Sequence, residues 1–100
     1  MRQEGRTYRH PFLILSLLPN GLPHNRYGFV TAKRLGKAVV RNRVRRLLKE
    51  AVRLLHPNLK SGFDIVLIAR ESAVGQPFLA VQGAVHETFQ RANLLIEDIR

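Results

Sequence analysis

The hydrophobic residues of this chain are concentrated in three short runs, at residues 12–18, 27–32 and 63–69. Each run is rich in large apolar residues and has proline, glycine or asparagine close by, which predicts strands separated by turns. The third run, FDIVLIA, is almost continuously apolar, as in a central strand covered on both faces. The first two strands follow each other across a short loop, and we expect them to form an antiparallel pair.

Two further stretches, residues 37–55 and 77–96, carry apolar residues at helical spacing. Pro57 ends the first helix, because proline cannot continue one. The predicted order is β, β, α, β, α in a single domain spanning residues 1–100, with residues 1–9 as a flexible lead-in because they show no periodicity. On a helical wheel, one arc of the first helix collects its apolar residues and predicts a buried stripe: Val40, Val44, Leu47, Leu48, Ala51, Leu54 and Leu55.

Positive charge is concentrated in residues 33–53, KRLGKAVVRNRVRRLLKEAVR. This stretch has nine basic residues and one acid, Glu50, and so carries a net +8 of the chain's formal +10. An ordinary solvated helix surface mixes the two signs, and like charges at i, i+4 repel by about 0.2–0.5 kcal/mol per pair. A polyanionic partner would offset that repulsion. One i, i+4 row here consists only of cations: Arg41, Arg45, Lys49 and Arg53.

The amino-acid composition excludes several classes of function. The chain has no cysteine, which excludes disulfides and thiolate catalysis and suits the cytoplasm, where we expect this protein. The four histidines and seven acids are scattered, so we expect no catalytic residue, no metal site and no cofactor in the protein. The apolar runs are far shorter than the roughly 20 residues that span a bilayer, and the first ten residues are polar, unlike a signal peptide.

A sequence pI near 11.5 is typical of a nucleic-acid-binding protein. Arginine offers planar pairs of donors to phosphate, and Asn42, within the RNR sequence, offers both a donor and an acceptor. The arginine row suits phosphate contact better than base readout in a groove, which favours RNA over a DNA operator. A basic helix can also lie on an anionic membrane, but this helix needs its apolar face for the core. We therefore expect an RNA partner and neither DNA nor membrane.

The sequence GFVTAKRLGKAVVRNRVRRLLKE, residues 28–50, resembles the signature of the bacterial ribonuclease P protein component. In that family a strand leads through a basic turn containing glycine into a helix with the Arg-Asn-Arg motif, and FDIVLIAR here is similar to the family's last strand. The similarity covers residues 5–95. It implies an α/β (α+β) two-layer sandwich, in which a small mixed sheet packs with the basic helix and a C-terminal helix. It also implies a left-handed βαβ crossover, against the usual right-handed preference.

The resemblance implies a function as well. The chain would be the protein subunit of ribonuclease P, an endonuclease that removes the 5′ leader of precursor tRNA, and its partners would be the ribonuclease P RNA and precursor tRNA. In that family the RNA performs the cleavage with Mg²⁺, so the protein would be an accessory subunit. The alternative is a structural RNA-binding protein of ribosomal type, which would share the charge but support no RNA-dependent nuclease activity.

By the same resemblance, RNA-binding residues lie in the basic turn and along the helix that follows: Lys33, Arg34, Lys37, Arg41, Asn42, Arg43, Arg45, Arg46, Lys49 and Arg53. The sheet beside the helix would form a cleft for the leader. The residues expected to line it are Phe12, Ile14, Ser16, Phe29 and Thr31. Relatives carry a further helix that helps to line this cleft, ahead of the segment matched here. For a chain without it, we expect weaker discrimination between precursor and mature tRNA.

Overall fold

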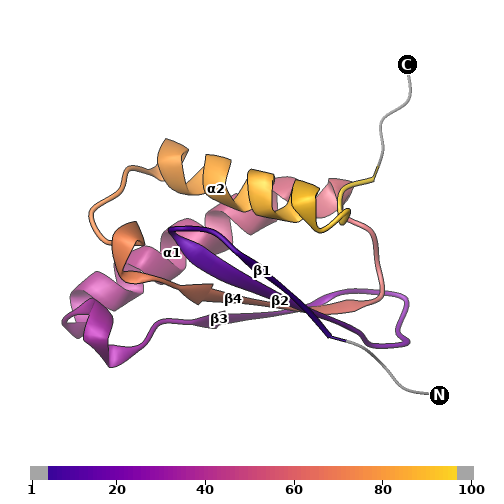
Figure 1. Ribbon diagram of the computed structural model, residues 1–100, viewed down its shortest axis with the longest axis horizontal. Helices are drawn as coiled ribbons and strands as arrows, with labels where there is room; N and C mark the ends of the chain where they lie inside the picture. The colour runs from indigo at the N-terminus through magenta and orange to yellow at the C-terminus, as the bar shows by residue number, and fades with distance from the viewer. Residues whose placement is uncertain (1–4, 97–100) are drawn as a thin grey trace.

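The computed structural model describes residues 5–96, which form a four-stranded sheet with two helices (Figure 1). Single turns of 3-10 helix, η1 (Lys33–Leu35), η2 (His56–Asn58) and η3 (Glu71–Ala73), lie in the connections. The main elements are, in chain order, β1 (Arg6–Arg9), β2 (Leu13–Pro19), β3 (Arg26–Val30), α1 (Ala38–Leu55), β4 (Phe63–Ala69) and α2 (Phe78–Arg91).

The sheet has the strand order β1-β2-β4-β3, with β2 antiparallel and β3 parallel to the central β4. The expected antiparallel pairing of β2 with β3 is therefore wrong, because β4 lies between them. Asn25 helps to explain why β2 and β3 are not neighbours. Its amide donates to the carbonyl of Lys60 (2.9 Å), and its Oδ1 accepts from the Phe63 N–H (2.9 Å). The loop after β2 is thus anchored to the segment that enters β4, and this holds β2 and β3 one strand apart.

Residues 1–9 were expected to be a flexible lead-in, but Arg6–Arg9 forms the edge strand β1. It pairs antiparallel with β2, where Tyr8 lies opposite Leu15 and packs against the core. The free edge of β2 offers unpaired backbone groups that a short polar strand can satisfy without an apolar pattern of its own. Residues 1–4 lie outside the described part of the chain.

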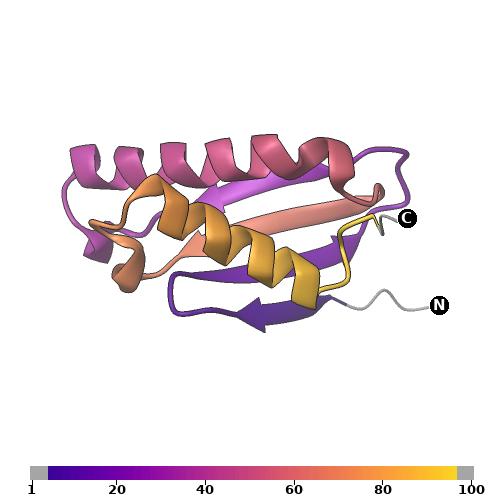
Figure 2. The same cartoon turned by 90° about the horizontal axis from the view of Figure 1, so that it is seen from above.

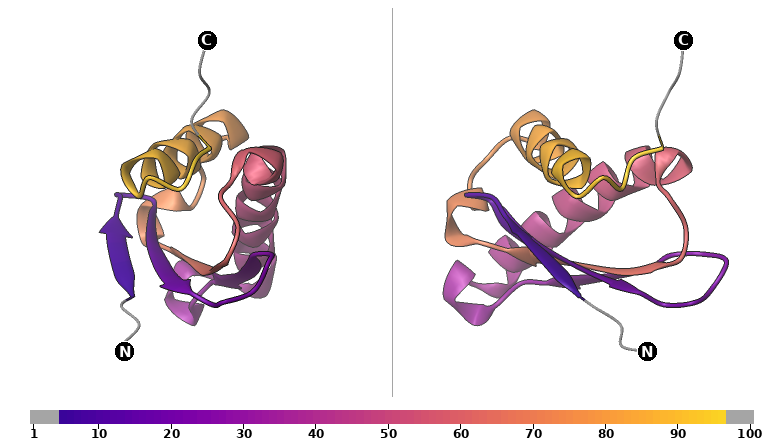
Figure 3. Two further views of the ribbon diagram at one scale, coloured as in Figure 1. Left: turned by 90° about the vertical axis from the view of Figure 1, so that its right-hand side faces the viewer. Right: turned by 45° about the vertical axis from the view of Figure 1, so that its right-hand side comes forward.

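Both helices cover the same face of the sheet, α1 over β3 and β4 and α2 over β2 and β1 (Figures 2 and 3). Seen from the helix side in Figure 2, the chain passes from β3 through α1 to the parallel β4 in a left-handed crossover, as the resemblance implied. The buried strand residues alternate along each strand and face the helices: Leu13, Leu15, Leu17, Ile65, Leu67 and Ala69.

On the other face of the sheet the side chains of β2 and β4 are only partly buried, as at Ile14, Ser16, Val66 and Ile68. The expectation that β4 is covered on both faces is therefore wrong, since within residues 5–96 helices pack on one face alone. An apolar run does not by itself require two covering layers. Here it supplies a core on one side and an open, mostly apolar surface on the other.

The predicted stripe of α1 is largely confirmed, since Val44, Leu48 and Ala51 are buried. Val52 is buried as well, at 4% exposure, whereas Leu54 is 42% exposed, so the buried face is turned slightly toward β3. The C-terminal helix was predicted to reach residue 96 but ends at Arg91. Asn93 then takes a left-handed conformation (φ 59°), which stops the helix.

Asp64, near the start of the central strand β4, is bonded to the edge strand β3 and to the loop between β2 and β3. Arg26 donates two hydrogen bonds of 2.8 Å to its carboxylate and Asn20 donates one of 3.0 Å, and together they lower the pKa of Asp64 to about 2. A folded pKa below the unfolded value of about 3.9 stabilises the fold at neutral pH, and that stability is lost as the pH falls from about 4 to about 2.

We therefore expect the melting temperature of Asp64→Asn to fall less steeply than that of the natural chain between pH 4 and pH 2. Thermal unfolding followed by circular dichroism measures this. Glu71→Gln is the matched control, because Glu71 is exposed and its contact with Arg34 is long, at 3.9 Å. Equal acid sensitivity of Asp64→Asn and the natural chain would contradict the assignment.

Candidate nucleic-acid interface

The basic helix α1 begins after a tight turn that glycine makes possible. Gly36 has φ 136°, and a Cβ at this position would come within 3.4 Å of the Val40 side chain. Leu35 is buried just before Gly36, whereas Lys33 and Arg34, the first two residues of the 3-10 turn η1, are exposed. Leu35 therefore packs the turn against the core, while Lys33 and Arg34 remain in contact with solvent.

Lys37 is the N-cap residue of α1, and the first turn of the helix contains no acid. Cations near this end are unfavourable, because the helix dipole places positive charge there. The guanidinium of Arg41 is held over the same end by a 3.2 Å hydrogen bond from its Nε to the Gly36 carbonyl. Positive charge thus accumulates where an external anion would stabilise the helix most.

Most of the predicted cations of α1 lie on its exposed face. Two of them, Arg45 and Arg43, reach toward neighbouring segments on opposite sides of the helix. Arg45 donates to Thr31 Oγ1 (2.6 Å), beyond the end of β3, and to Asn42 Oδ1 (3.1 Å). Arg43 reaches the opposite flank, where it donates to the Gln76 carbonyl (3.3 Å) ahead of α2. The basic face therefore spans the full exposed width of the helix, and Arg45 fixes the orientation of the Asn42 amide.

Glu50, the one acid of residues 33–53, forms an ion pair with Arg53 of the same helix. Arg53 donates two hydrogen bonds to Glu50, of 3.0 and 2.6 Å, and these lower the pKa of that carboxyl group. Arg53 was predicted as an RNA-binding residue, but its guanidinium is shared with Glu50. Arg46 and Lys49 remain exposed, and within the described part of the chain no carboxylate pairs with either.

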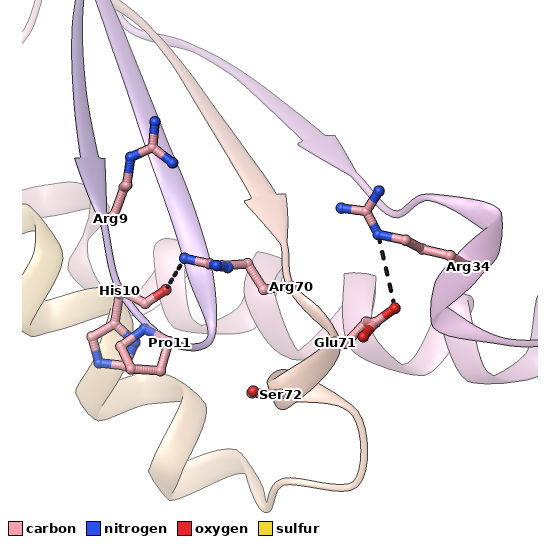
Figure 4. A pocket seen from close by; sticks show the side chains of 7 residues that line it. All are labelled: Arg9, His10, Pro11, Arg34, Arg70, Glu71 and Ser72. Carbon is pink, nitrogen blue, oxygen red and sulfur yellow. Dashed lines mark hydrogen bonds and ion pairs between the residues drawn. The ribbon is translucent and has the colours of Figure 1, made fainter.

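A second cationic feature is a pocket of about 590 Å³ at one end of the sheet (Figure 4). Three arginines line it: Arg9, Arg34 and Arg70. Their partners are few and distant, since Arg70 donates to the His10 carbonyl at 3.4 Å and Arg34 lies 3.9 Å from Glu71. The pocket continues the positive surface from the start of α1 around the edge of the sheet.

Only Arg34 of these three was predicted from the sequence. Strands β1, β3 and β4 run in the same direction, so the residues at their C-terminal ends meet at one edge of the sheet. Arg9 ends β1 and Arg70 directly follows β4. The position of Arg9 could have been inferred only if β1 had been recognised.

The five residues predicted to line the leader cleft do not lie together. Ile14 and Ser16 are on the open face of the sheet, opposite Ile68 and Val66 of β4. Phe29 is on the helix face, paired with buried Leu67. Thr31 and Phe12 are at strand ends, Thr31 at 8% exposure and bonded to Arg45, Phe12 half-buried with its ring against that of His10.

Within residues 5–96, no group of three His, Cys, Asp or Glu residues is arranged to hold a metal ion. No helix in the same range combines the length and apolar character needed to cross a membrane.

A mixed four-stranded sheet that carries a one-sided cationic helix defines the class: a small two-layer α+β nucleic-acid-binding domain. The family model for Ribonuclease P matches residues 1–93. The ribonuclease P protein component of Roseiflexus sp. (strain RS-1) is 48% identical over 95% of this chain and 79% of its own length. That of Caldanaerobacter subterraneus subsp. tengcongensis is 38% identical over 97% of this chain and 84% of its own.

Solved structures agree with these sequence matches. The RNase P protein from Thermotoga maritima aligns with a TM-score of 0.81 and 27% identity, over 95% of this chain and 86% of that one. A Staphylococcus aureus RNase P protein mutant with defective mRNA degradation activity aligns with a TM-score of 0.85 and 25% identity, over 92% and 78%. The chain belongs to the ribonuclease P protein family, whose members are subunits of the ribonuclease that processes the 5′ end of tRNA. This confirms the family resemblance, and the ribosomal-type alternative is not favoured.

Proposed function

We propose that the chain binds the catalytic RNA of ribonuclease P through the exposed face of α1 and leaves the chemistry to that RNA. The observation that carries this proposal is the one-sided charge of the helix, whose apolar stripe is buried against the core while most of its cations, Arg46 and Lys49 among them, are exposed. Phosphate contacts on this face would relieve the repulsion between neighbouring cations.

The chemistry of the side chains supports an accessory role. Arginine is a permanent cation that donates hydrogen bonds but cannot take a proton as a general base. Asn42 is neutral, and Glu50, the one carboxylate of the stretch, is engaged by Arg53. These groups are suited to bind and orient phosphates, and in this proposal Mg²⁺ reaches the cleavage site through the RNA subunit. We place the assembly in the cytoplasm.

We further propose that the 5′ leader of precursor tRNA crosses the open face of the sheet. Ile14, Val66 and Ile68 offer partly exposed apolar surface there. The arginine pocket at the end of the same sheet would bind a leader phosphate. Leader contact would thus rest on Ile14 and Ser16 from the predicted set and on the newly found Arg9 and Arg70. Phe29 and Thr31, on the helix face, would have no part in it.

The binding proposal predicts a strong dependence on salt. Each phosphate neutralised by an arginine or lysine releases counterions and adds roughly 0.7 to 0.9 to the slope of log affinity against log salt. We therefore expect a slope several times that of a single contact for a bacterial ribonuclease P RNA. Filter binding between 50 and 400 mM KCl measures it. An affinity that does not change with salt concentration would show that α1 makes no phosphate contacts, and would contradict its proposed role in binding RNA.

A further inference from the structure

A groove of about 320 Å³ lies between the edge strand β3 and the second half of α1, which runs along that strand (Figure 2). It is on the helix side of the sheet and therefore separate from the open face with Ile14 and Ser16. Its volume is at the lower end of ligand sites, roughly 300–1,000 Å³, and suits one small planar group. The residues that define it are Tyr27, Phe29, Lys49, Val52, Arg53 and His56.

The aromatic wall of this groove is held in place by hydrogen bonds. The Tyr27 hydroxyl lies 2.7 Å from His56 Nδ1, and the Asn25 amide donates to the same hydroxyl at 3.4 Å. The Tyr27 and His56 rings also meet edge to face, with centroids 5.7 Å apart. Val52, only 4% exposed, closes the groove on the side of α1. The Tyr27 and His56 rings are thus ordered in advance, so a ligand would lose little free energy in fixing them.

Two cations, Lys49 and Arg53, line the same groove. The Lys49 ammonium is 6.0 Å from the centroid of the Phe29 ring, and Arg53 lines the groove while it pairs with Glu50. Aromatic faces beside fixed positive charge are how proteins hold single-stranded nucleic acid, since the base stacks on the rings and the phosphate meets the cation. Lys49 and Arg53 also belong to the basic face of α1, so RNA bound there would pass the groove.

We propose that this groove binds one unpaired nucleotide of the catalytic RNA, with its base against Phe29 and Tyr27 and a phosphate at Lys49. This inference rests on the proposed function of α1. It adds a site for a single base, on the face of the sheet away from the proposed leader path.

Tyrosine fluorescence can test the proposal while both aromatic rings of the groove wall are kept. The chain has two tyrosines and no tryptophan, so Tyr8→Phe leaves Tyr27 as the one tyrosine reporter. The matched control, Tyr27→Phe, leaves Tyr8 on β1, at the opposite edge of the sheet. The probes are a short oligoadenylate, a blunt RNA duplex and inorganic polyphosphate, with binding followed independently by the anisotropy of labelled RNA.

We expect oligoadenylate to quench Tyr27 in step with its binding and to leave Tyr8 unchanged apart from absorption by the RNA. Duplex and polyphosphate, which offer no free base, should bind without quenching Tyr27. Catalytic RNA should quench Tyr27, and adding precursor tRNA to that complex should leave the quenching unchanged. Phe29→Leu, which keeps an apolar side chain, should weaken oligoadenylate binding roughly tenfold and leave duplex binding unchanged, with its folding checked by thermal unfolding.

Binding of oligoadenylate without any change at Tyr27 would overturn the base site while leaving the proposed function intact. Equal quenching by polyphosphate would show a phosphate site without base recognition, which also contradicts the proposal. Loss of the quenching when precursor tRNA is added to that complex would contradict the assignment of the groove to the catalytic RNA. Failure of every RNA to bind would instead overturn the proposed function of α1, and the groove with it.

Discussion

Replacing Leu48 with alanine is expected to lower the free energy of unfolding by about 2–5 kcal/mol. Leu48 is fully buried on the inner stripe of α1, and its removal leaves a cavity where the helix meets the rest of the core. Such a loss is a large fraction of the roughly 5–15 kcal/mol that stabilises a small domain. Urea unfolding measures the change, and RNA affinity of the folded protein should be unaltered.

Leu54→Ala is the matched control, because it makes the same change in the same helix at a residue that is 42% exposed. It should cost about 1 kcal/mol or less, since much of that side chain is already in water. Equal losses at Leu48 and Leu54 would mean that the orientation of α1 on the core is wrong.

Reversing the charge at Arg46 is expected to weaken binding to the catalytic RNA by roughly 10- to 100-fold, with little effect on stability. Arg46 is exposed in the middle of the basic face, so Arg46→Glu removes a phosphate donor and adds repulsion. The affinity and its salt dependence are measured together, and the salt slope should decrease by about the value of one contact.

Arg6→Glu controls for the overall charge, because it changes the net charge equally at an exposed residue of β1, on the edge of the sheet opposite β3. It should reduce affinity far less. If both reversals weaken binding to the same extent, RNA responds to the net charge of the protein and α1 is not a specific interface.

The sequence predicted the elements with the strongest patterns. Helix α1 was placed within one residue and β4 to the residue, because each has an unbroken apolar pattern bounded by glycine or proline. Strand β1 was missed because RTYR has a single side chain, Tyr8, that packs on the core, and its stability comes from backbone pairing with β2. The pairing of β2 with β4 and the Asn25 contacts that accompany it both join residues distant in the sequence, so the local pattern did not predict them.

The candidate site shows the same division. The cations of α1 follow from the helical wheel, since the apolar stripe fixes which residues face solvent. The leader residues could not be assigned in this way, because Ile14 and Leu15 are both apolar and the sequence does not tell which one faces the helices. Arg9 and Arg70 converge only through the order and direction of the strands, which the sequence did not determine.

Cleavage of precursor tRNA in a reconstituted complex tests the central claim most directly. The protein is mixed with a bacterial ribonuclease P RNA and precursor tRNA at a low Mg²⁺ concentration at which the RNA alone is nearly inactive. We predict that the complex removes the 5′ leader, that nuclease-free protein without RNA cleaves nothing, and that Arg46→Glu loses most of the gain. Two results would contradict the proposal that α1 binds a catalytic RNA. One is cleavage by the protein without RNA, and the other is an unchanged cleavage rate when the natural chain is added to the RNA.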